Sequence, residues 1–508
     1  MKINTAYQEK SKEELLALLL QKDVQINSLN ELLRIYRYRQ FGNKSEKSSP
    51  NQLSIFNEAD LPKTPEKIIQ ADEEIHIAAH TRTKSPGRKP LPENLPREQR
   101  IYDLAEEEKI CSCGQSLTHI KDETCEQLEI IPAKVYVIQH VKKKYACRKC
   151  EETIKTASMP AQPIPRSIAS PGLLSHVLVS KFEDHLPLHR QEQMLRRIGI
   201  DIPRSTLSLW VIRSAELLKP MMPIMHKNII GYDIAYSDET TVQVLKDPNK
   251  SVNSKKYMWL FAGGVPDKFC FYYRYHHSRS HDVALNFFDG YKGYIHCDGF
   301  PGYDTLASKS AYIKLSGCLY HARRKFVEII KVTQAKEGVA HNVLLYIAKL
   351  AKIEEEIKLF STHDKFNLRL EKAKPLLDEL HTYLTDMQPR TVPKSPLGQA
   401  VSYTLNQWPK LLTYLEDGRL DNNNNRSERA IKPFVIGRKG WLFADSVAGA
   451  EAAAIIFSLV ETCKHHGIEA YDWFRYVLQQ LPLCQSDPEI EALMPFNIDR
   501  QLIERQAI

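Results

Sequence analysis

The chain has 508 residues and a formal net charge of +8 at pH 7, in a composition of globular type. This length exceeds one ordinary core, so several domains are expected, and the positive charge mildly favours a polyanionic partner. The sequence contains no run of about 18 apolar residues and no apolar signal-peptide core at its start. We therefore expect a soluble, cytoplasmic, nucleoid-associated protein with no membrane partner.

Residues 1–47 contain a leucine-rich seam whose positions alternate in steps of four and three, with one polar interruption at Lys22. These positions are Leu15, Leu19, Lys22, Ile26, Leu29, Leu33 and Tyr36. The spacing predicts a coiled coil and hence a homo-oligomer, the alternative being an amphipathic helix packed on its own chain. A basic arm that could contact a duplex follows the seam. It contains Arg34, Arg37, Arg39, Lys44 and Lys47.

Residues 48–100 are rich in proline and charge and lack apolar periodicity, which predicts a linker. Residues 101–160 follow as a small metal-binding module. Its ligands would be two cysteine pairs: Cys111, Cys113, Cys147 and Cys150. Four thiolates would hold a structural Zn²⁺ in a ribbon-like module. Because the first pair is one residue shorter than CxxC, one ligand could instead be one of three residues: His119, Cys125 or His140.

The remaining cysteines lie in apolar surroundings and are expected in the core. They are Cys270, Cys297, Cys318, Cys463 and Cys484.

Residues 161–225 predict a helical region with a helix-turn-helix-like pattern. One helix is expected at 191–198 and a second at 204–218, with a turn between them and Trp210 buried. A plain helical hairpin that leads into the next domain is an equally good interpretation.

Residues 226–320 predict the first part of a catalytic core with a mixed sheet. Strands are expected at 229–237, 256–263, 269–275, 294–297 and 313–319, with a helix at 281–291. The second and third strands would form a hairpin. Asp238 and Asp298 each follow a strand, where sites often form. Their structural alternatives are a solvated strand end at Asp238 and a turn at Asp298-Gly299.

Residues 321–420 are charged and have apolar residues at helical spacing, which predicts a helical insertion. A basic group opens this insertion directly after the last predicted strand. It consists of His321, Arg323, Arg324 and Lys325. These side chains are candidates for phosphate contact, and the alternative is a solvated basic face.

Residues 421–480 predict the second part of the core, and residues 481–508 a C-terminal tail. The run DNNNNRSERAIKP, residues 421–433, suits a turn followed by a helix start that carries Glu428. Asn425 and Glu428 also fit a capping box, and Pro433 is expected to kink or end the first helical turn. Basic residues surround this acid as candidate DNA contacts. They are Arg426, Arg429, Lys432, Arg438 and Lys439.

Two acids after strands and one on a later helix suggest a metal site. Asp238, Asp298 and Glu428 could hold hard cations such as Mg²⁺, which prefer oxygen ligands. Two such ions about 3.5 to 4 Å apart can activate an attacking oxygen and stabilise a leaving one. The pattern therefore indicates chemistry on phosphodiesters.

Several motifs, in order, resemble the insertion-sequence-66 family of transposases. They are SDET (237–240), HCDGFPGY (296–303), GCLYHARRKF (317–326) and DNNNNRSERAIKP followed by GRKGWLF. The resemblance implies a ribonuclease-H-like core with Asp238, Asp298 and Glu428 at the catalytic Asp-Asp-Glu positions. It also implies Mg²⁺- or Mn²⁺-dependent cleavage and strand transfer at element ends, that is, DNA transposition and recombination.

The partners implied by the resemblance are terminal-repeat DNA, target DNA and smaller accessory proteins of the same element. Two alternatives are a regulatory or assembly protein that binds element DNA without catalysis, and a structure-specific nuclease that has the metal site but performs no strand transfer.

Overall fold

The computed structural model describes residues 135–146 and 154–504, together with single positions between Ser11 and Arg37. The chain divides into two compact units, one formed by residues 1–61 with 160–508 and the other by residues 62–159. The described positions of the leucine-rich segment are helical, and the side chains of Leu19, Ile26 and Leu33 are exposed. Pairing of this helix with a second copy stays a prediction.

In the unit of residues 62–159, the structure describes one antiparallel strand pair. Strand β1 (Lys144–Ala146) pairs with β2 (Ile154–Thr156). The predicted zinc ligands Cys147 and Cys150 belong to the segment that joins these strands, outside the described residues. Cys111 and Cys113 also lie outside the described residues.

The other unit contains a five-stranded mixed sheet. Its strands are β3 (Ile234–Val242), β5 (Lys256–Gly263), β6 (Cys270–His276), β7 (Gly293–His296) and β8 (Ile313–Ser316). The spatial order is β6-β5-β3-β7-β8, in which β5 is antiparallel to both of its neighbours and β3, β7 and β8 run parallel. The predicted hairpin is therefore confirmed.

The first predicted strand was placed wrongly. Ile229 lies in a helix, α5 (Met221–Ile230), which ends at Gly231, and β3 begins only at Ile234. Because β3 continues to Val242, Asp238 stands inside the strand opposite Leu260 rather than after its end. A short apolar run does not distinguish a buried helix from a strand, and this ambiguity produced the error.

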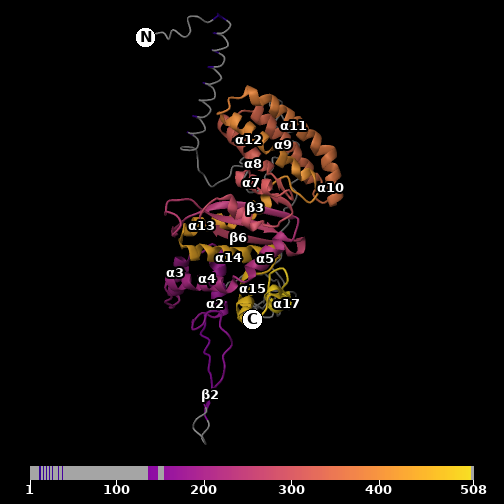
Figure 1. Ribbon diagram of the computed structural model, residues 1–508. Helices are drawn as coiled ribbons and strands as arrows, with labels where there is room; N and C mark the ends of the chain where they lie inside the picture. Colours follow the sequence, from indigo (N-terminus) through magenta and orange to yellow (C-terminus); the bar gives the residue numbers. More distant parts are fainter. Residues whose placement is uncertain are drawn as a thin grey trace, which may run out of the picture. The chain divides into compact units, whose positions relative to one another are not determined.

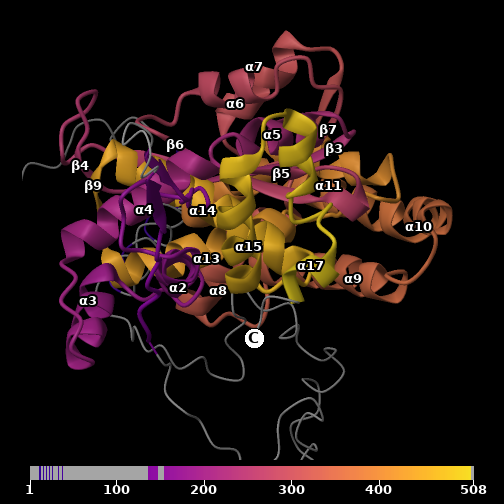
Figure 2. The same cartoon turned by 90° about the horizontal axis from the view of Figure 1, so that it is seen from below.

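Helices cover both faces of the sheet, as Figure 2 shows. On one face lie α6 (His281–Phe287) and α7 (Pro301–Lys309); Phe287 of α6 stacks on Phe261 of β5 with ring centroids 3.7 Å apart. On the other face, α13 (Asn425–Trp441) packs on β3 and α14 (Val447–His465) on β6. Neighbouring residues of β3 therefore face different helices, because side chains alternate along a strand.

Helix α14 protects the edge of the sheet with side-chain hydroxyls. The backbone N–H of Tyr273 donates to Ser458 Oγ at 2.8 Å, and that of Phe271 donates to Thr462 Oγ1 at 3.2 Å. Each hydroxyl in turn donates to a carbonyl of its own helix. The two amides of edge strand β6 are thus satisfied without a further strand. Figure 1 shows β6 beside α14.

Pro433 does not end the first turn of α13, although ending that turn was one of the two outcomes expected from the sequence. The helix continues through it to Trp441. Ala430, Ile431 and Phe434 are buried, and the hydroxyl of Tyr273 donates to the carbonyl of Ala430 in the same turn. Tertiary packing therefore offsets the donor that the proline lacks.

The helical insertion between β8 and α13 is confirmed. It contains α8 (Leu319–Thr333), α9 (Val339–Glu356), α10 (Thr362–Leu368), a π-helical turn (Arg369–Ala373), α11 (Lys374–Met387) and α12 (Pro396–Leu412). Buried Arg369 donates to both carboxylate oxygens of Glu354, at 3.0 and 2.7 Å, and to the carbonyls of Tyr414 and Asp417. This group connects the insertion to the segment that returns to the sheet.

The remaining helices are α2 (Pro171–Phe182), α3 (Leu188–Arg197), α4 (Arg204–Leu218), α15 (Ala470–Gln480), α16 (Asp487–Ala492) and α17 (Arg500–Glu504). Of these, α2, α4 and α15 pack on α14, α3 packs on α2 and α4, α16 on α5 and α17 on α15. Helices α3 and α4 match the predicted pair, and Trp210 is buried as expected. Two short strands, β4 (Val244–Lys246) and β9 (Ala444–Ser446), form a parallel pair that the sequence did not predict. None of the described helices is long and apolar enough to span a membrane.

The expectation for the five remaining cysteines is also met. Cys270, Cys297, Cys318 and Cys463 are buried, and Cys484 is half-buried against the core.

Candidate active site

The three predicted catalytic acids come from neighbouring elements. Asp238 lies within β3, Asp298 follows the parallel strand β7, and Glu428 lies in the first turn of α13. The side-chain amide of Asn424 donates to the carbonyl of Ser237 at 3.3 Å, which fixes the start of α13 against β3 beside Asp238. This contact brings the start of α13 to the strand of Asp238, but within the described part of the chain the three acids do not form a group whose ligand atoms all lie within 4.8 Å of one another.

The acids influence one another electrostatically. Burial raises the pKa of Asp238 well above its usual range, and the nearby carboxylates of Glu239, Asp298 and Glu428 raise it further. Burial also raises the pKa of Glu428; Arg324 lowers that pKa, and Asp298 raises it. Mutual repulsion of buried carboxylates is the condition that a bound cation relieves. The acids therefore suit a cation, and hard ions such as Mg²⁺ prefer this type of ligand.

A fourth acid, Glu239, lies on the face of β3 opposite to that of Asp238. It accepts hydrogen bonds from Arg279 Nε at 2.6 Å and from the Tyr303 hydroxyl at 2.9 Å. Burial and the charge of Asp298 raise the pKa of Glu239 to about 7, although Arg279 lowers it. Arg279 Nη2 is also 3.3 Å from Asp298 Oδ2, so one guanidinium neutralises two acids.

Arg279 was missed by the analysis of the sequence. It follows β6 in a short segment, Ser278 to Ser280, that carries no motif. Its guanidinium lies over the ring of Phe300, 4.1 Å from the centroid, which fixes its position between the acids. Only the pairing of β3 with β7 brings Glu239 and Asp298 to the same cation.

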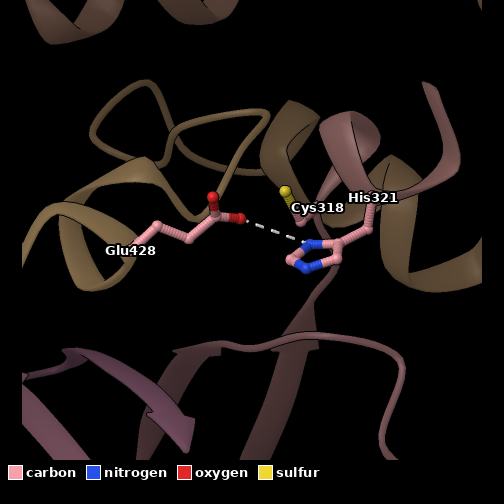
Figure 3. A group of neighbouring side chains, drawn as sticks. All are labelled: Cys318, His321 and Glu428. Carbon is pink, nitrogen blue, oxygen red and sulfur yellow. Dashed lines mark ion pairs between the residues drawn. The ribbon is translucent and has the colours of Figure 1, made fainter. Parts of the chain in front are cut away.

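Glu428 faces the start of α8 through both of its oxygens. Oε1 is 3.5 Å from His321 Nδ1, and Oε2 is 3.6 Å from Arg324 Nη2. Burial and the charge of Arg324 lower the pKa of His321, whereas the charge of Asp298 raises it. Cys318 lies beside them, and the ligand atoms of Cys318, His321 and Glu428 are within 4.8 Å of one another. Figure 3 shows the three side chains converging.

The structure does not form the predicted capping box. The N-cap of α13 is Asn424 rather than Asn425, and its side chain makes no capping hydrogen bond. The carboxylate of Glu428 turns toward α8 instead of back to the helix start. The asparagines do serve the turn, since the N–H of Asn425 donates to Asn423 Oδ1 at 3.0 Å.

The predicted phosphate contacts divide into two groups. His321 and Arg324 lie beside Glu428. Lys325 instead lies over the ring of Tyr403. Arg323 lies near Tyr320, and burial lowers its pKa.

Along α13 the basic residues are spread over several directions. Arg426 lies over the rings of Tyr236 and Phe269, and Arg438 donates to Thr241 Oγ1 at 3.2 Å. Arg429 and Lys439 are exposed, and Lys432 is half-buried.

Comparison with protein families identifies the class. The model described as "Transposase IS66 family" matches residues 166–452, and that described as "zinc-finger binding domain of transposase IS66" matches residues 108–151. Residues 28–100 match "Transposase C of IS166 homeodomain", and residues 458–496 match "IS66 C-terminal element". These matches, on a mixed sheet with many helices, define an insertion-sequence transposase, a class of nucleic-acid-processing enzyme. The chain belongs to the IS66 transposase family.

Relatives extend over most of the chain. Uncharacterized protein y4jD of Sinorhizobium fredii (strain NBRC 101917 / NGR234) is 33% identical over 421 residues, which cover 80% of this chain and 81% of the relative. Uncharacterized protein y4qI of the same organism is 29% identical over 493 residues, which cover 93% of this chain and 89% of the relative. The matched domains imply DNA binding and indicate zinc and a further divalent metal as ligands.

Proposed function

We propose that this transposase cleaves element ends and joins them to target DNA in a Mg²⁺- or Mn²⁺-dependent reaction at Asp238, Asp298 and Glu428. The observation that carries the proposal is the electrostatic coupling of these acids, which burial and mutual repulsion make unfavourable without a cation. They would hold two ions, with Glu428 Oε1 free of any hydrogen-bond partner among the described residues.

The order of the strands supports a ribonuclease-H-like core. In chain order, the first strand is central, the next two form an antiparallel extension on one side, and the last two add in parallel on the other. The first and fourth strands are therefore neighbours, which brings Asp238 and Asp298 together. The helical insertion lies in the chain between the last strand and the helix of Glu428.

When bound, the metal ions would supply charge stabilisation at the attacking and leaving oxygens of the phosphodiester. The chain's own groups would orient the reactants. Arg324 Nη2 lies 3.6 Å from one oxygen of Glu428, and the guanidinium would also bind a phosphate oxygen. His321 lies beside the same acid, where a ring N–H could donate to a phosphate oxygen. Arg279 fixes Asp298 from the opposite side.

DNA binding would use the other parts of the chain. The four predicted zinc ligands fall within residues 108–151, which match the zinc-finger model. Helices α3 and α4 are joined by a turn that contains Gly199 at φ +84°, and Arg204 and Ser205 at the start of α4 are exposed. The exposed apolar side chains of the N-terminal helix would pair two copies. Arg429, Lys432, Arg438 and Lys439 of α13 would contact the backbone of the DNA.

The direct test is cleavage and strand transfer on terminal-repeat DNA with Mg²⁺, in the presence of the element's accessory proteins. Asp238→Ala, Asp298→Ala and Glu428→Gln are each expected to lower the rate by roughly a hundredfold or more while DNA binding persists. Asp445→Asn, which removes an exposed acid paired with Lys246, serves as the control. Full activity in any of the three variants would remove that residue from the site. DNA binding without cleavage by the wild type would indicate a regulatory protein, and cleavage without joined products a nuclease.

A further inference from the structure

A second type of ligand set lies next to the carboxylates. Cys318 is the N-cap residue of α8, His321 lies one turn later on the same helix, and Glu428 reaches them from α13. The thiol, the imidazole and the carboxylate converge from two rigid elements, as Figure 3 shows. Their ligand atoms lie within 4.8 Å of one another.

Two of the three ligand atoms lack partners. His321 Nδ1 and Glu428 Oε1 are buried and make no hydrogen bond among the described residues, although they are 3.5 Å apart. Buried polar atoms are rarely left unsatisfied, and each such case requires an explanation. Arg324 contacts the other carboxylate oxygen, Oε2, so Oε1 remains directed at the histidine.

One of the three separations suits a tetrahedral ion, and the thiol lies within 4.8 Å of the other two ligand atoms. Zinc binds sulfur at about 2.3 Å and nitrogen or oxygen at about 2.0 to 2.2 Å, so ligands on one ion lie about 3.5 Å apart. The separation of His321 Nδ1 and Glu428 Oε1 already has this value. Cys318 Sγ accepts the backbone N–H of Asn424 at 3.3 Å, a contact of the kind that orients metal ligands.

We propose that Cys318, His321 and Glu428 form a transition-metal site for Zn²⁺ or an ion of similar softness, with its fourth position open to water or phosphate. Thiolate and imidazole ligands select such ions, whereas Mg²⁺ selects oxygen. The site is separate from the cysteine module of residues 108–151.

The proposal has a consequence that rests on the proposed function. Glu428 belongs to both ligand sets, so an ion held by Cys318 and His321 engages the carboxylate that the Mg²⁺ site requires. Zn²⁺ and Mg²⁺ therefore compete through one side chain, and micromolar free Zn²⁺ is expected to inhibit Mg²⁺-dependent cleavage.

The test is cobalt substitution of the full-length protein, with Co²⁺ as the probe and metal content measured per chain. Wild type is expected to bind one more ion per chain than Cys318→Ser or His321→Gln, and both variants should lose part of the visible absorption of tetrahedral Co²⁺. Cys484→Ser, which alters a half-buried cysteine distant in sequence, should match the wild type. Circular dichroism establishes that each variant is folded, and His321→Gln decides the result if Cys318→Ser does not fold. Equal stoichiometry and equal spectra in the wild type and His321→Gln would overturn the proposal.

The same experiment separates this site from the proposed function. Asp238→Asn should retain the Cys318-dependent cobalt signal while it loses cleavage, and Glu428→Gln should lose both. A cobalt signal that depends on Cys318 in a protein without any Mg²⁺-dependent cleavage would support the metal site and refute the catalytic proposal. Mg²⁺-dependent cleavage by a protein that shows no Cys318-dependent cobalt signal would support the catalytic proposal and refute the metal site.

Discussion

Asn424 donates its side-chain amide to the carbonyl of Ser237 at 3.3 Å, and this hydrogen bond joins the helix of Glu428 to the strand of Asp238. Asn424 is 1% exposed, so alanine would leave the carbonyl of a buried strand without this donor. Loss of one buried hydrogen bond costs about 1 to 3 kcal/mol. We expect Asn424→Ala to lower the free energy of unfolding by this amount and to reduce cleavage more than DNA binding. Denaturant titration and cleavage assays measure the two effects. Asn253→Ala, a change at an exposed asparagine, is the control, and equal losses in both variants would contradict the assignment.

A second prediction concerns Arg279, which neutralises Glu239 and Asp298. Arg279→Gln should lower the melting temperature of the metal-free protein at pH 7.5, because two neighbouring acids then lose their common cation. Mg²⁺ should restore more of the melting temperature in this variant than in wild type. Lys374→Gln, which removes an exposed pair with Asp378, should have little effect. A variant as stable as wild type in EDTA would show that the guanidinium is dispensable.

The pH dependence of stability follows from the acids. The pKa of Glu239 is raised from 4.5 to about 7 in the folded protein, so the folded state binds the proton more tightly than the unfolded state. Stability should therefore fall as pH rises from about 4.5 to about 7, by roughly 3 kcal/mol for this group. The raised pKa values of Asp238 and Glu428 act in the same direction.

We expect the unfolding free energy in EDTA to be lower at pH 8 than at pH 6, with a smaller difference in Glu239→Gln. Glu355→Gln, a change at an exposed acid, should leave the dependence of the unfolding free energy on pH as in the wild type. Denaturant titrations at both pH values provide the measurement. An unchanged slope in Glu239→Gln would assign the pH dependence to other groups.

The buried pair of Arg369 and Glu354 gives a prediction for the insertion. The side chains are 3% and 20% exposed, and the arginine also donates to two carbonyls. Removing one partner leaves an uncompensated buried charge, so Glu354→Ala should destabilise the protein by about 3 to 5 kcal/mol. Lys358→Gln, which removes an exposed pair with Glu355 on the same segment, should change stability by less than about 1 kcal/mol. Similar unfolding midpoints for the two variants would refute this role.

The sequence predicted most of the sheet because its strands have strong local signals. Aromatic residues followed by Gly263-Gly264 and Pro266 placed β5 at its observed limits. The start of β3 was wrong because apolar Ile229 and Ile230 continue a helix. The short strands β4 and β9 were missed because residues 200 positions apart in the sequence form that pair.

The site was predictable only where a residue carries a motif. Asp238, Asp298 and Glu428 could be proposed from strand ends and the asparagine run. Arg279 could not, since its role depends on which strands are neighbours. Cys318 was expected in the core, and it is buried; its convergence with His321 and Glu428 depends on the packing of α8 against α13.

The hydroxyls of Ser458 and Thr462 determine where a fragment of this protein can end without exposing the edge of β6. The catalytic family match ends at residue 452, before both of them. A fragment that stops there would keep β6 and lose the groups that occupy its edge amides, leaving a free template for intermolecular strand addition. We expect such a fragment to form β-rich aggregates in size-exclusion chromatography, while a fragment that continues to residue 480 stays dispersed. In the intact chain, the hydroxyls of α14 occupy these two amides, so they are not available for pairing with a strand of another copy.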